Sequence, residues 1–219
     1  MDRTLDHLRY AGLSPSLQRH VFSQMVLESP MLADALHRLQ ELGGKASDSW
    51  LVSGALYNTI WNRLTGRPGL HGIKDLDIIY FDDSDLSWEA EDAVIARGAE
   101  VFRNFPLPVE IRNQARVHLW FEKRFGQPYA PLRCATESIE RYSAIAHCVG
   151  ARLAKEGETA QGGLLIHAPF GLDDIFSFRL RPNRAIDNRQ TYEIKADRAL
   201  KFWPELTVRA GMCRIELFR

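Results

Sequence analysis

The chain has 219 residues, of which 45% are hydrophobic and 26% charged, as in ordinary globular proteins and unlike disordered or membrane-spanning chains. Its 28 basic and 28 acidic residues give a net charge of zero, which argues against a protein dedicated to binding nucleic-acid duplexes. The opening residues lack the apolar stretch of a signal peptide, and no apolar run is long enough to cross a membrane. The three cysteines are widely spaced and form no C-x-x-C pair, so we expect a soluble, cytoplasmic protein without a disulfide framework.

The N-terminal residues are expected to form two helices. Ser14-Pro15 and Ser29-Pro30 each combine a favourable N-cap residue with a proline suited to the first helical position. Apolar residues recur at helical spacing between these starts, and the second helix is expected to stop at Gly43-Gly44. These helices form a lead-in over residues 1–44.

The pattern changes at residue 50, where Trp50 to Val52 predicts a short buried strand that turns directly into a helix ending at Gly66. Such a turn, here Ser53-Gly54, leaves free backbone N–H groups at the helix N-terminus, a ready site for an anion. Gly54 has no side chain to block a phosphate. Asn58, one turn further along, either adds a hydrogen-bond donor or satisfies its own backbone. Ser53, Gly54 and Asn58 are therefore candidates for nucleotide binding.

A clear strand is predicted over residues 75–81, and it carries a pair of carboxylates. Asp75 and Asp77 leave the same face of this strand, while Leu76 and Ile78 face a core. Two like charges at close range are costly unless a cation lies between them, and Mg²⁺ is typically held by one or two carboxylates and substrate phosphates. The alternative is the start of an acidic loop, with Asp75 capping a turn and Asp77 solvated.

A helix capped by Ser87 is predicted next, over 88–102, and then a strand over 109–112 that carries a third carboxylate, Glu110. Two aspartates on one face, a third acid on another strand and a phosphate cradle together indicate two-metal phosphoryl chemistry. If the strand continues, one face presents Glu110, Arg112, Gln114, Arg116 and His118. Guanidinium groups bind phosphate well, so Arg116 is a candidate nucleotide ligand, with an ion pair to the acidic block 75–92 as its alternative. For Arg112 that ion pair is the favoured interpretation.

The C-terminal part is expected to contain a hairpin, from residues 145–153 and 164–167, and two helices, over 171–178 and 188–203. Asp173 is predicted to be the N-cap of the first of these helices. The second helix is rich in basic residues. A solvated face is favoured for most of them, with the acceptor or pyrophosphate side of a cleft as the alternative.

Several runs of this sequence resemble a known group of proteins. They are SGALYN, DLDIIYFD, VEIRNQARVHLW, APFGLDDIF and the Trp-Pro pair at 203–204, and NQARVH is the most specific of them. They are similar to bacterial stand-alone nucleotidyltransferase-like proteins of the polymerase-β nucleotidyltransferase superfamily, and the resemblance covers residues 50–204. It implies an α+β fold with a small mixed sheet, arranged as one domain with a nucleotidyltransferase core (45–123) between the N-terminal helices and an accessory α/β half (124–219).

The resemblance also implies roles for individual residues. Gly54 matches the glycine at the start of the phosphate-facing helix, Asp75 and Asp77 match the paired metal ligands, and Glu110 matches the third carboxylate, which also helps to deprotonate the acceptor. The implied activity is a nucleotidyltransferase that depends on Mg²⁺, with Mn²⁺ as the alternative ion. It transfers NMP from an NTP to an unknown acceptor and releases pyrophosphate.

Two other functions stay open at this point. Ala55 stands where better-known members of the superfamily have serine, and Asp75 lies further from the glycine than usual. Both departures favour a non-catalytic nucleotide-binding or regulatory module, whereas the three carboxylates argue against it. The third candidate is a two-metal hydrolase of nucleotides or phosphodiesters. The expected partners of the transferase are an NTP and the unknown acceptor, with no sign of a membrane partner and no strong nucleic-acid signature.

Overall fold

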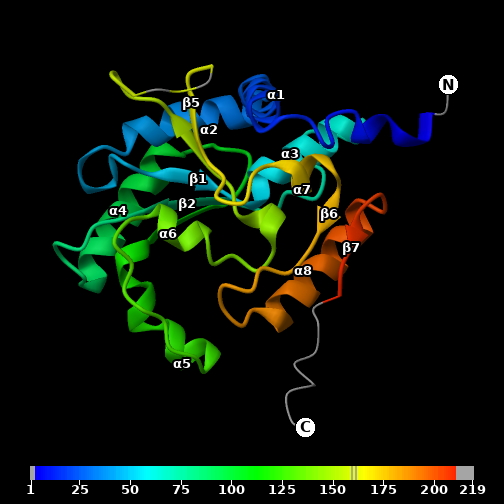
Figure 1. Ribbon diagram of the computed structural model, residues 1–219. Coiled ribbons are helices and arrows are strands. Elements are labelled where there is room, and N and C mark those ends of the chain that lie inside the picture. The colour runs from blue at the N-terminus through cyan, green and yellow to red at the C-terminus, as the bar shows by residue number, and fades with distance from the viewer. Residues whose placement is uncertain (1–2, 159, 161, 211–219) are drawn as a thin grey trace, which may run out of the picture.

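A five-stranded mixed sheet with the strand order β3-β2-β1-β4-β5 organises the fold (Figure 1). The computed structural model describes residues 3–158, 160 and 162–210, so Cys213 lies outside the described residues. The strands are β1 (Trp50–Val52), β2 (Leu76–Tyr80), β3 (Val109–Asn113), β4 (Gly150–Leu153) and β5 (Leu164–His167). β1 is antiparallel to β2 and β4, β4 is antiparallel to β5, and β3 is parallel to β2. The predicted α+β class with a small mixed sheet is confirmed.

The helices lie on both sides of this sheet. They are α1 (Pro15–Leu27), α2 (Pro30–Glu41), α3 (Gly54–Thr65), α4 (Trp88–Val101), α5 (Phe121–Phe125), α6 (Thr136–Ile139), α7 (Asp173–Phe176) and α8 (Arg189–Phe202). Figure 1 shows α1 and α2 on one side of the sheet and α5, α6 and α8 on the other. No helix of the described chain is both long enough and apolar enough to span a bilayer.

The two faces of the sheet differ in how they are covered. Leu51, Leu76, Ile78 and Ile111 belong to the main hydrophobic core, together with the apolar faces of α1, α2 and α3. The other face carries a smaller cluster, made of Trp50, Val52, Ile79, Ala135, Ile139 and Cys148. Alternation along β2 therefore sends Leu76 and Ile78 into the core, as predicted, and leaves the opposite face for Asp77.

The predicted helix starts are confirmed at three positions. Ser14 accepts a hydrogen bond from the Leu17 amide at 3.4 Å, and Ser29 accepts one from the Leu32 amide at 3.5 Å. Ser87 accepts from the Ala90 amide at 3.2 Å and begins α4. Each serine thus satisfies one of the amides that a helix N-terminus leaves without an intrahelical partner.

The C-terminal part follows the prediction with shorter elements. β4 and β5 form the expected antiparallel hairpin, but residues 145–147 are a 3-10 helix and not part of the first strand. α7 has a single turn, and α8 agrees with the prediction. A short parallel pair, β6 (Arg179–Leu180) and β7 (Thr207–Val208), lies beside α8.

Candidate active site

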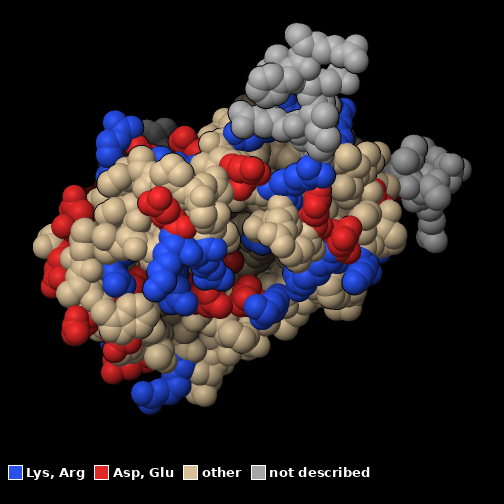
Figure 2. Space-filling view, turned by 90° about the horizontal axis from the view of Figure 1, so that it is seen from below, with Lys and Arg blue, Asp and Glu red and all other residues tan. Residues whose placement is uncertain are grey.

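A cleft of about 730 Å³ opens on the sheet face that carries Asp77. Figure 2 shows this side of the molecule, which is hollowed between groups of basic and acidic side chains. Four of the predicted site residues line the cleft: Ser53, Asp77, Glu110 and Arg116. The other three, Asp75, Gly54 and Asn58, are not part of the lining, but they belong to the segments that supply Asp77 and Ser53.

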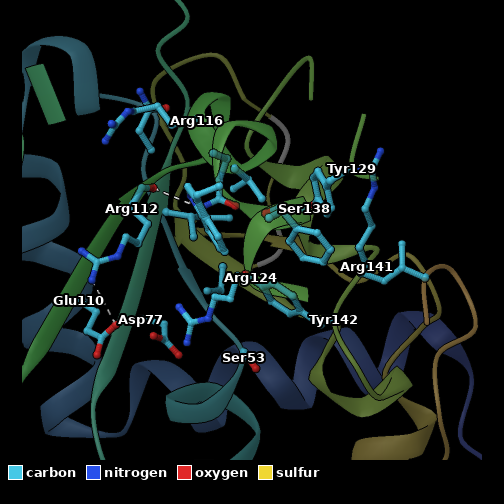
Figure 3. Close-up of a pocket in the computed structure, with 18 of the residues that line it drawn as sticks. Ser53, Asp77, Glu110, Arg112, Arg116, Arg124, Tyr129, Ser138, Arg141 and Tyr142 are labelled. Atoms are coloured by element: carbon cyan, nitrogen blue, oxygen red, sulfur yellow. Dashed lines mark hydrogen bonds and ion pairs between the residues drawn. The ribbon is translucent and has the colours of Figure 1, made fainter. Parts of the chain in front are cut away.

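Two of the predicted metal-binding carboxylates lie side by side. Asp77 and Glu110 are register partners on the parallel strands β2 and β3, so their side chains leave the same face of the sheet (Figure 3). Asp75 comes directly before the first residue of β2 and two positions before Asp77. Its negative charge contributes to raising the pKa of Asp77.

Asp77 lies in an environment that disfavours its negative charge. Burial, followed by the charge of Asp75, raises its pKa from 3.8 to about 6. Lys195 offsets part of this effect and Glu110 adds to it. Within the described chain the Asp77 carboxylate makes no hydrogen bond or ion pair. An additional cation at this position would therefore stabilise the ionised carboxylate.

The neighbouring carboxylates are held by exposed cations. Lys74 Nζ lies 3.0 Å from Asp75, and Arg112 Nη2 lies 3.7 Å from Glu110. No three His, Cys, Asp or Glu side chains among the residues placed by the structure converge into a complete metal site. Exposed ion pairs contribute little to stability, so both carboxylates can exchange their partners for a divalent ion at small cost. Carboxylate oxygens are also the ligands that Mg²⁺ prefers.

The N-terminus of α3 forms an anion-binding geometry beside these carboxylates. Ser53 has a left-handed backbone, with φ 56° and ψ −114°, and its side chain does not cap the helix. A Cβ added at Gly54 would meet only the Asn58 amide nitrogen, at 3.9 Å, so there is room for a ligand above the first turn. Asn58 is buried, and its Oδ1 lacks a partner among the described atoms. The free space above the first turn, the backbone N–H groups of α3 and the Asn58 side-chain amide thus lie together at the N-terminus of α3.

The expectation that residues 110–118 continue as one extended face is wrong. β3 ends at Asn113, and residues 114–119 form a 3-10 helix (η3, Gln114–Leu119). The reason is the Asn113 side chain, whose Oδ1 accepts from the Ala115 amide at 3.0 Å and turns the chain. Asn113 Nδ2 also donates to the Asp82 carbonyl at 2.7 Å, and Asn113 Oδ1 accepts from the Asp82 amide at 3.1 Å. The NQAR segment therefore fastens the end of β3 to the loop after β2.

The two arginines of this segment have different surroundings. The Arg116 guanidinium forms an ion pair with the buried Glu91, donates to the Leu86 carbonyl at 3.1 Å and lies 5.2 Å from the centre of the Trp88 ring. These contacts brace one wall of the cleft. Arg112 is half exposed, and among the described residues it pairs with Glu110 and not with the acidic block 75–92, so the favoured interpretation is wrong about the partner. The guanidinium with donors to spare for a ligand is thus that of Arg112.

Several residues that line the cleft were missed or placed elsewhere by the sequence analysis. They are Trp120, Arg124, Tyr129, Ser138, Arg141, Tyr142 and Lys195. All but Lys195 lie in residues 120–142, where short elements give no periodic pattern to interpret. Lys195 belongs to the basic helix α8, whose side chains were expected mainly in solvent. One signal could have found it, because Thr191, Lys195 and Arg198 recur at helical spacing.

Asp173 and Asp174 have structural partners, and the prediction that Asp173 caps a helix is wrong. The cap position of α7 is Leu172, and Asp173 is the first residue of the helix. Asp173 Oδ1 instead accepts from the Gly12 amide at 2.8 Å and from Gln18 at 2.9 Å. The buried Asp174 pairs with Arg179 and Arg181 at 2.7 and 2.6 Å. The pair therefore ties the N-terminal segment to β6.

Comparisons with known proteins identify the family and the fold of the chain. A family model described as nucleotidyltransferase matches residues 44–208. The fold is similar to an NMR structure described as revealing a CCA-adding enzyme head domain, with a TM-score of 0.69 and 24% sequence identity over 93% of this chain and 100% of that one. No curated protein matches at a significant level. The chain therefore belongs to the nucleotidyltransferase family, and its fold is of the polymerase-β nucleotidyltransferase type.

Proposed function

We propose that the protein is a metal-dependent nucleotidyltransferase that moves NMP from an NTP to an acceptor and releases pyrophosphate. The observation that carries this proposal is the juxtaposition of Asp77, which has no ion-pair partner among the described residues, with Glu110 and with the α3 N-terminus, all around one cleft. Carboxylates next to an anion-binding helix end suit a substrate that combines a metal ion with a polyphosphate.

Asp75, Asp77 and Glu110 would hold the divalent ion, Mg²⁺ or Mn²⁺. When bound, the ion neutralises the repelling carboxylates and withdraws charge from the phosphoryl group that is transferred. Glu110 has a second task, because its carboxylate is half exposed at the cleft. It would accept the proton of the acceptor hydroxyl as that oxygen attacks.

The β- and γ-phosphates would bind at the N-terminus of α3. There the Ser53-Gly54 turn and the Asn58 amide supply donors, and the helix dipole favours negative charge. Lys195 lines the cleft from α8 and adds a positive charge close to Asp77. The half-exposed Arg112 guanidinium would contact the phosphates directly. Arg116 is held in the side of the cleft by its ion pair with Glu91 and would act on the phosphate charge from there. Cations placed in advance stabilise the charge that develops on the leaving pyrophosphate.

Replacing Gly54 by Ala tests the phosphate site without disturbing the free protein. The new methyl group meets only the Asn58 amide at 3.9 Å, an ordinary contact, but it fills the space that a phosphate would use. We expect Gly54→Ala to weaken Mg·NTP binding roughly tenfold or more, since one lost charge-assisted hydrogen bond accounts for such a factor. Isothermal titration calorimetry with each Mg·NTP measures the effect.

Gly69→Ala is the matched control for this experiment, because an added Cβ there meets nothing within 4 Å and φ is not positive. It should bind Mg·NTP like the wild type. If no Mg·NTP binds the folded wild-type protein, the transferase proposal is overturned. If Gly54→Ala binds as tightly as wild type, the phosphates do not bind at α3.

The raised pKa of Asp77 predicts how stability depends on pH when no metal is bound. Between pH 3.8 and about 6 the folded protein keeps a proton on Asp77 that the unfolded chain releases. Stability should therefore fall as pH rises through this window, by at most about 3 kcal/mol for a pKa difference of two units. Urea unfolding in EDTA between pH 4 and 7 should show this fall in the free energy of unfolding for the wild type and not for Asp77→Asn. Equal slopes in the two proteins would contradict the prediction, and Asp34→Asn, on the far side of the sheet, serves as the control.

A further inference from the structure

Large apolar side chains gather at one edge of the cleft, although most such residues are buried elsewhere. Trp88 is 64% exposed, Leu119 54% and Trp120 41%, and all three line the cleft. Phe121 and Phe125 pack against Trp120, with ring centres 6.0 and 6.4 Å away. We call these five residues the aromatic wall. An exposed apolar surface inside a functional cleft indicates a ligand that covers it.

Arginines accompany this aromatic wall. Arg116 lies over Trp88, and Arg124 lies over Trp120 and Phe125 at 5.9 and 5.4 Å from the ring centres. Arg124 lines the cleft and forms no ion pair with another described residue. On the opposite side, Arg141 lies 4.4 Å from the centre of the Tyr129 ring (Figure 3). Flat rings interleaved with guanidinium groups suit a ligand with a planar ring and an anionic group, such as a nucleotide, and repel a polycation.

The surroundings of the wall set a limit on the size of this ligand. Asp83, Asp85 and Glu89 flank Trp88 in the chain, and a depression next to Phe125 is lined by Asp187 and by the ion pair of Glu193 with Arg189. A single-stranded nucleic acid needs a groove of positive charge that follows successive phosphates. The acidic residues around Trp88 oppose such a path at one end of the wall, and the depression beside Phe125 offers no excess of positive charge at the other. A single nucleotide fits the cationic stretch between them.

The wall and the proposed phosphate site belong to different elements. Trp88 is in α4 and the other four residues follow β3, whereas the phosphate site is at the N-terminus of α3. Leu119, Trp120, Phe121 and Phe125 follow β3 through η3, so the segment that carries them leaves the sheet from the strand of Glu110. Because Glu110 is the proposed base, this is the side from which an acceptor would approach.

We infer that the aromatic wall binds the acceptor, and that the acceptor is a free nucleoside monophosphate whose base stacks on Trp120 and whose phosphate meets Arg124. The inference rests on the proposed transferase function. In the reaction an acceptor hydroxyl oxygen forms a bond to the α-phosphorus of the NTP. The bond from that phosphorus to the bridging oxygen of pyrophosphate breaks, pyrophosphate leaves with the electron pair, and Glu110 takes the hydroxyl proton.

Tryptophan fluorescence provides a direct test, since Trp88 and Trp120 are exposed whereas Trp50, Trp61 and Trp203 are buried. AMP, CMP, GMP and UMP are titrated into the full-length protein with Mg²⁺ and a saturating non-hydrolysable NTP analogue, so that the NTP site is filled. Ribose 5-phosphate and a single-stranded RNA pentamer are titrated in parallel. We expect at least one monophosphate to quench the fluorescence and to bind more tightly than ribose 5-phosphate.

Variants then assign the binding to the wall. Trp120→Ala and Arg124→Gln should weaken monophosphate binding roughly tenfold, as expected for the loss of one stacked base or one phosphate contact. Both should bind Mg·NTP within twofold of wild type. Phe170→Ala is the control, because Phe170 is exposed to a similar degree but does not line the cleft. Its affinity for monophosphate should not change.

Three results would overturn the inference. Ribose 5-phosphate could bind as tightly as every monophosphate, so that the base makes no contact. The pentamer could bind while no monophosphate does, so that the acceptor is a strand end. Trp120→Ala could weaken Mg·NTP binding as much as monophosphate binding, so that the wall holds the base of the NTP. If the transferase proposal itself fails, the result is different, because no Mg·NTP then binds to the wild type. In that case, titration of the monophosphates without the analogue tests whether the aromatic wall binds a nucleotide.

Discussion

Replacing Asp77 by Asn is expected to lower the rate of pyrophosphate release by roughly 10²- to 10³-fold or more, the range seen when one preorganised electrostatic group is removed from a reacting phosphoryl or acyl centre. Asp77 is half-buried, and unlike Asp75 and Glu110 it has no ion-pair partner in the described chain. Asn has the same shape but carries no charge, so it cannot hold the ion. The fold should persist, because the substitution removes a carboxylate whose pKa is already raised by burial.

The measurement is a pyrophosphate-release assay with each Mg·NTP and a panel of acceptors that includes nucleoside monophosphates, together with circular dichroism of both proteins. Asp34→Asn is the control, because Asp34 pairs with Arg38 on the surface of α2, far from the cleft. Wild-type turnover in Asp77→Asn would contradict the site assignment. Binding of Mg·NTP without turnover in the wild type would identify a non-catalytic nucleotide-binding module. Release of NMP and pyrophosphate into water without any acceptor would identify a hydrolase.

Features of the site that depend on local sequence could be predicted. The Ser53-Gly54 turn, the strand that carries Asp77 and the helix that Ser87 caps all follow from alternation, capping and glycine placement within a few residues. The parallel pairing of β2 and β3 then brings Glu110 beside Asp77. Short-range rules and one βαβ connection therefore account for this half of the cleft.

Features that depend on long-range side-chain contacts could not be predicted. Asn113 ends β3 through its local bond with Ala115, but the contacts that hold this side chain come from Asp82, 31 residues away. Arg116 is engaged by Glu91 of α4, which lies in the acidic block that was the alternative to nucleotide binding. Asp173 is engaged by Gly12 and Gln18 of the N-terminal segment, and these distant partners replace the capping role that the local sequence suggests. The distinctive NQAR and GLDD runs thus both have structural partners in the described chain.

The Trp203-Pro204 pair gives the second large expected effect. Trp203 is almost fully buried, packs edge-on against Trp61 with ring centres 5.3 Å apart, and donates from its indole N–H to Asn62 Oδ1 at 3.0 Å. Gly72 lies so close to the indole that an added Cβ would approach it to 2.4 Å. We expect Trp203→Ala to lower the free energy of unfolding by about 3 to 5 kcal/mol, through the lost contacts and the cavity that remains.

Trp203→Phe separates packing from hydrogen bonding. It keeps an aromatic ring against Trp61 but leaves Asn62 Oδ1 without its donor, which costs about 1 to 3 kcal/mol for a buried group. Urea unfolding of wild type, both variants and the surface control Phe170→Ala measures these differences. A loss below 1 kcal/mol in Trp203→Ala would show that this contact does not hold the C-terminal segment to the core.

The same substitution should also affect the site. The Asn62 side-chain amide donates to the Gly69 and His71 carbonyls at 3.1 and 2.8 Å, and so it holds the loop that leads into Asp75. When Trp203 is lost, Asn62 loses the partner that orients it, and this loop becomes more mobile. Trp203→Ala should therefore require a higher Mg²⁺ concentration for half-maximal turnover, measured at a temperature where it is still folded. An unchanged Mg²⁺ requirement in the folded variant would mean that Asp75 keeps its position without the contact between Trp203 and Asn62.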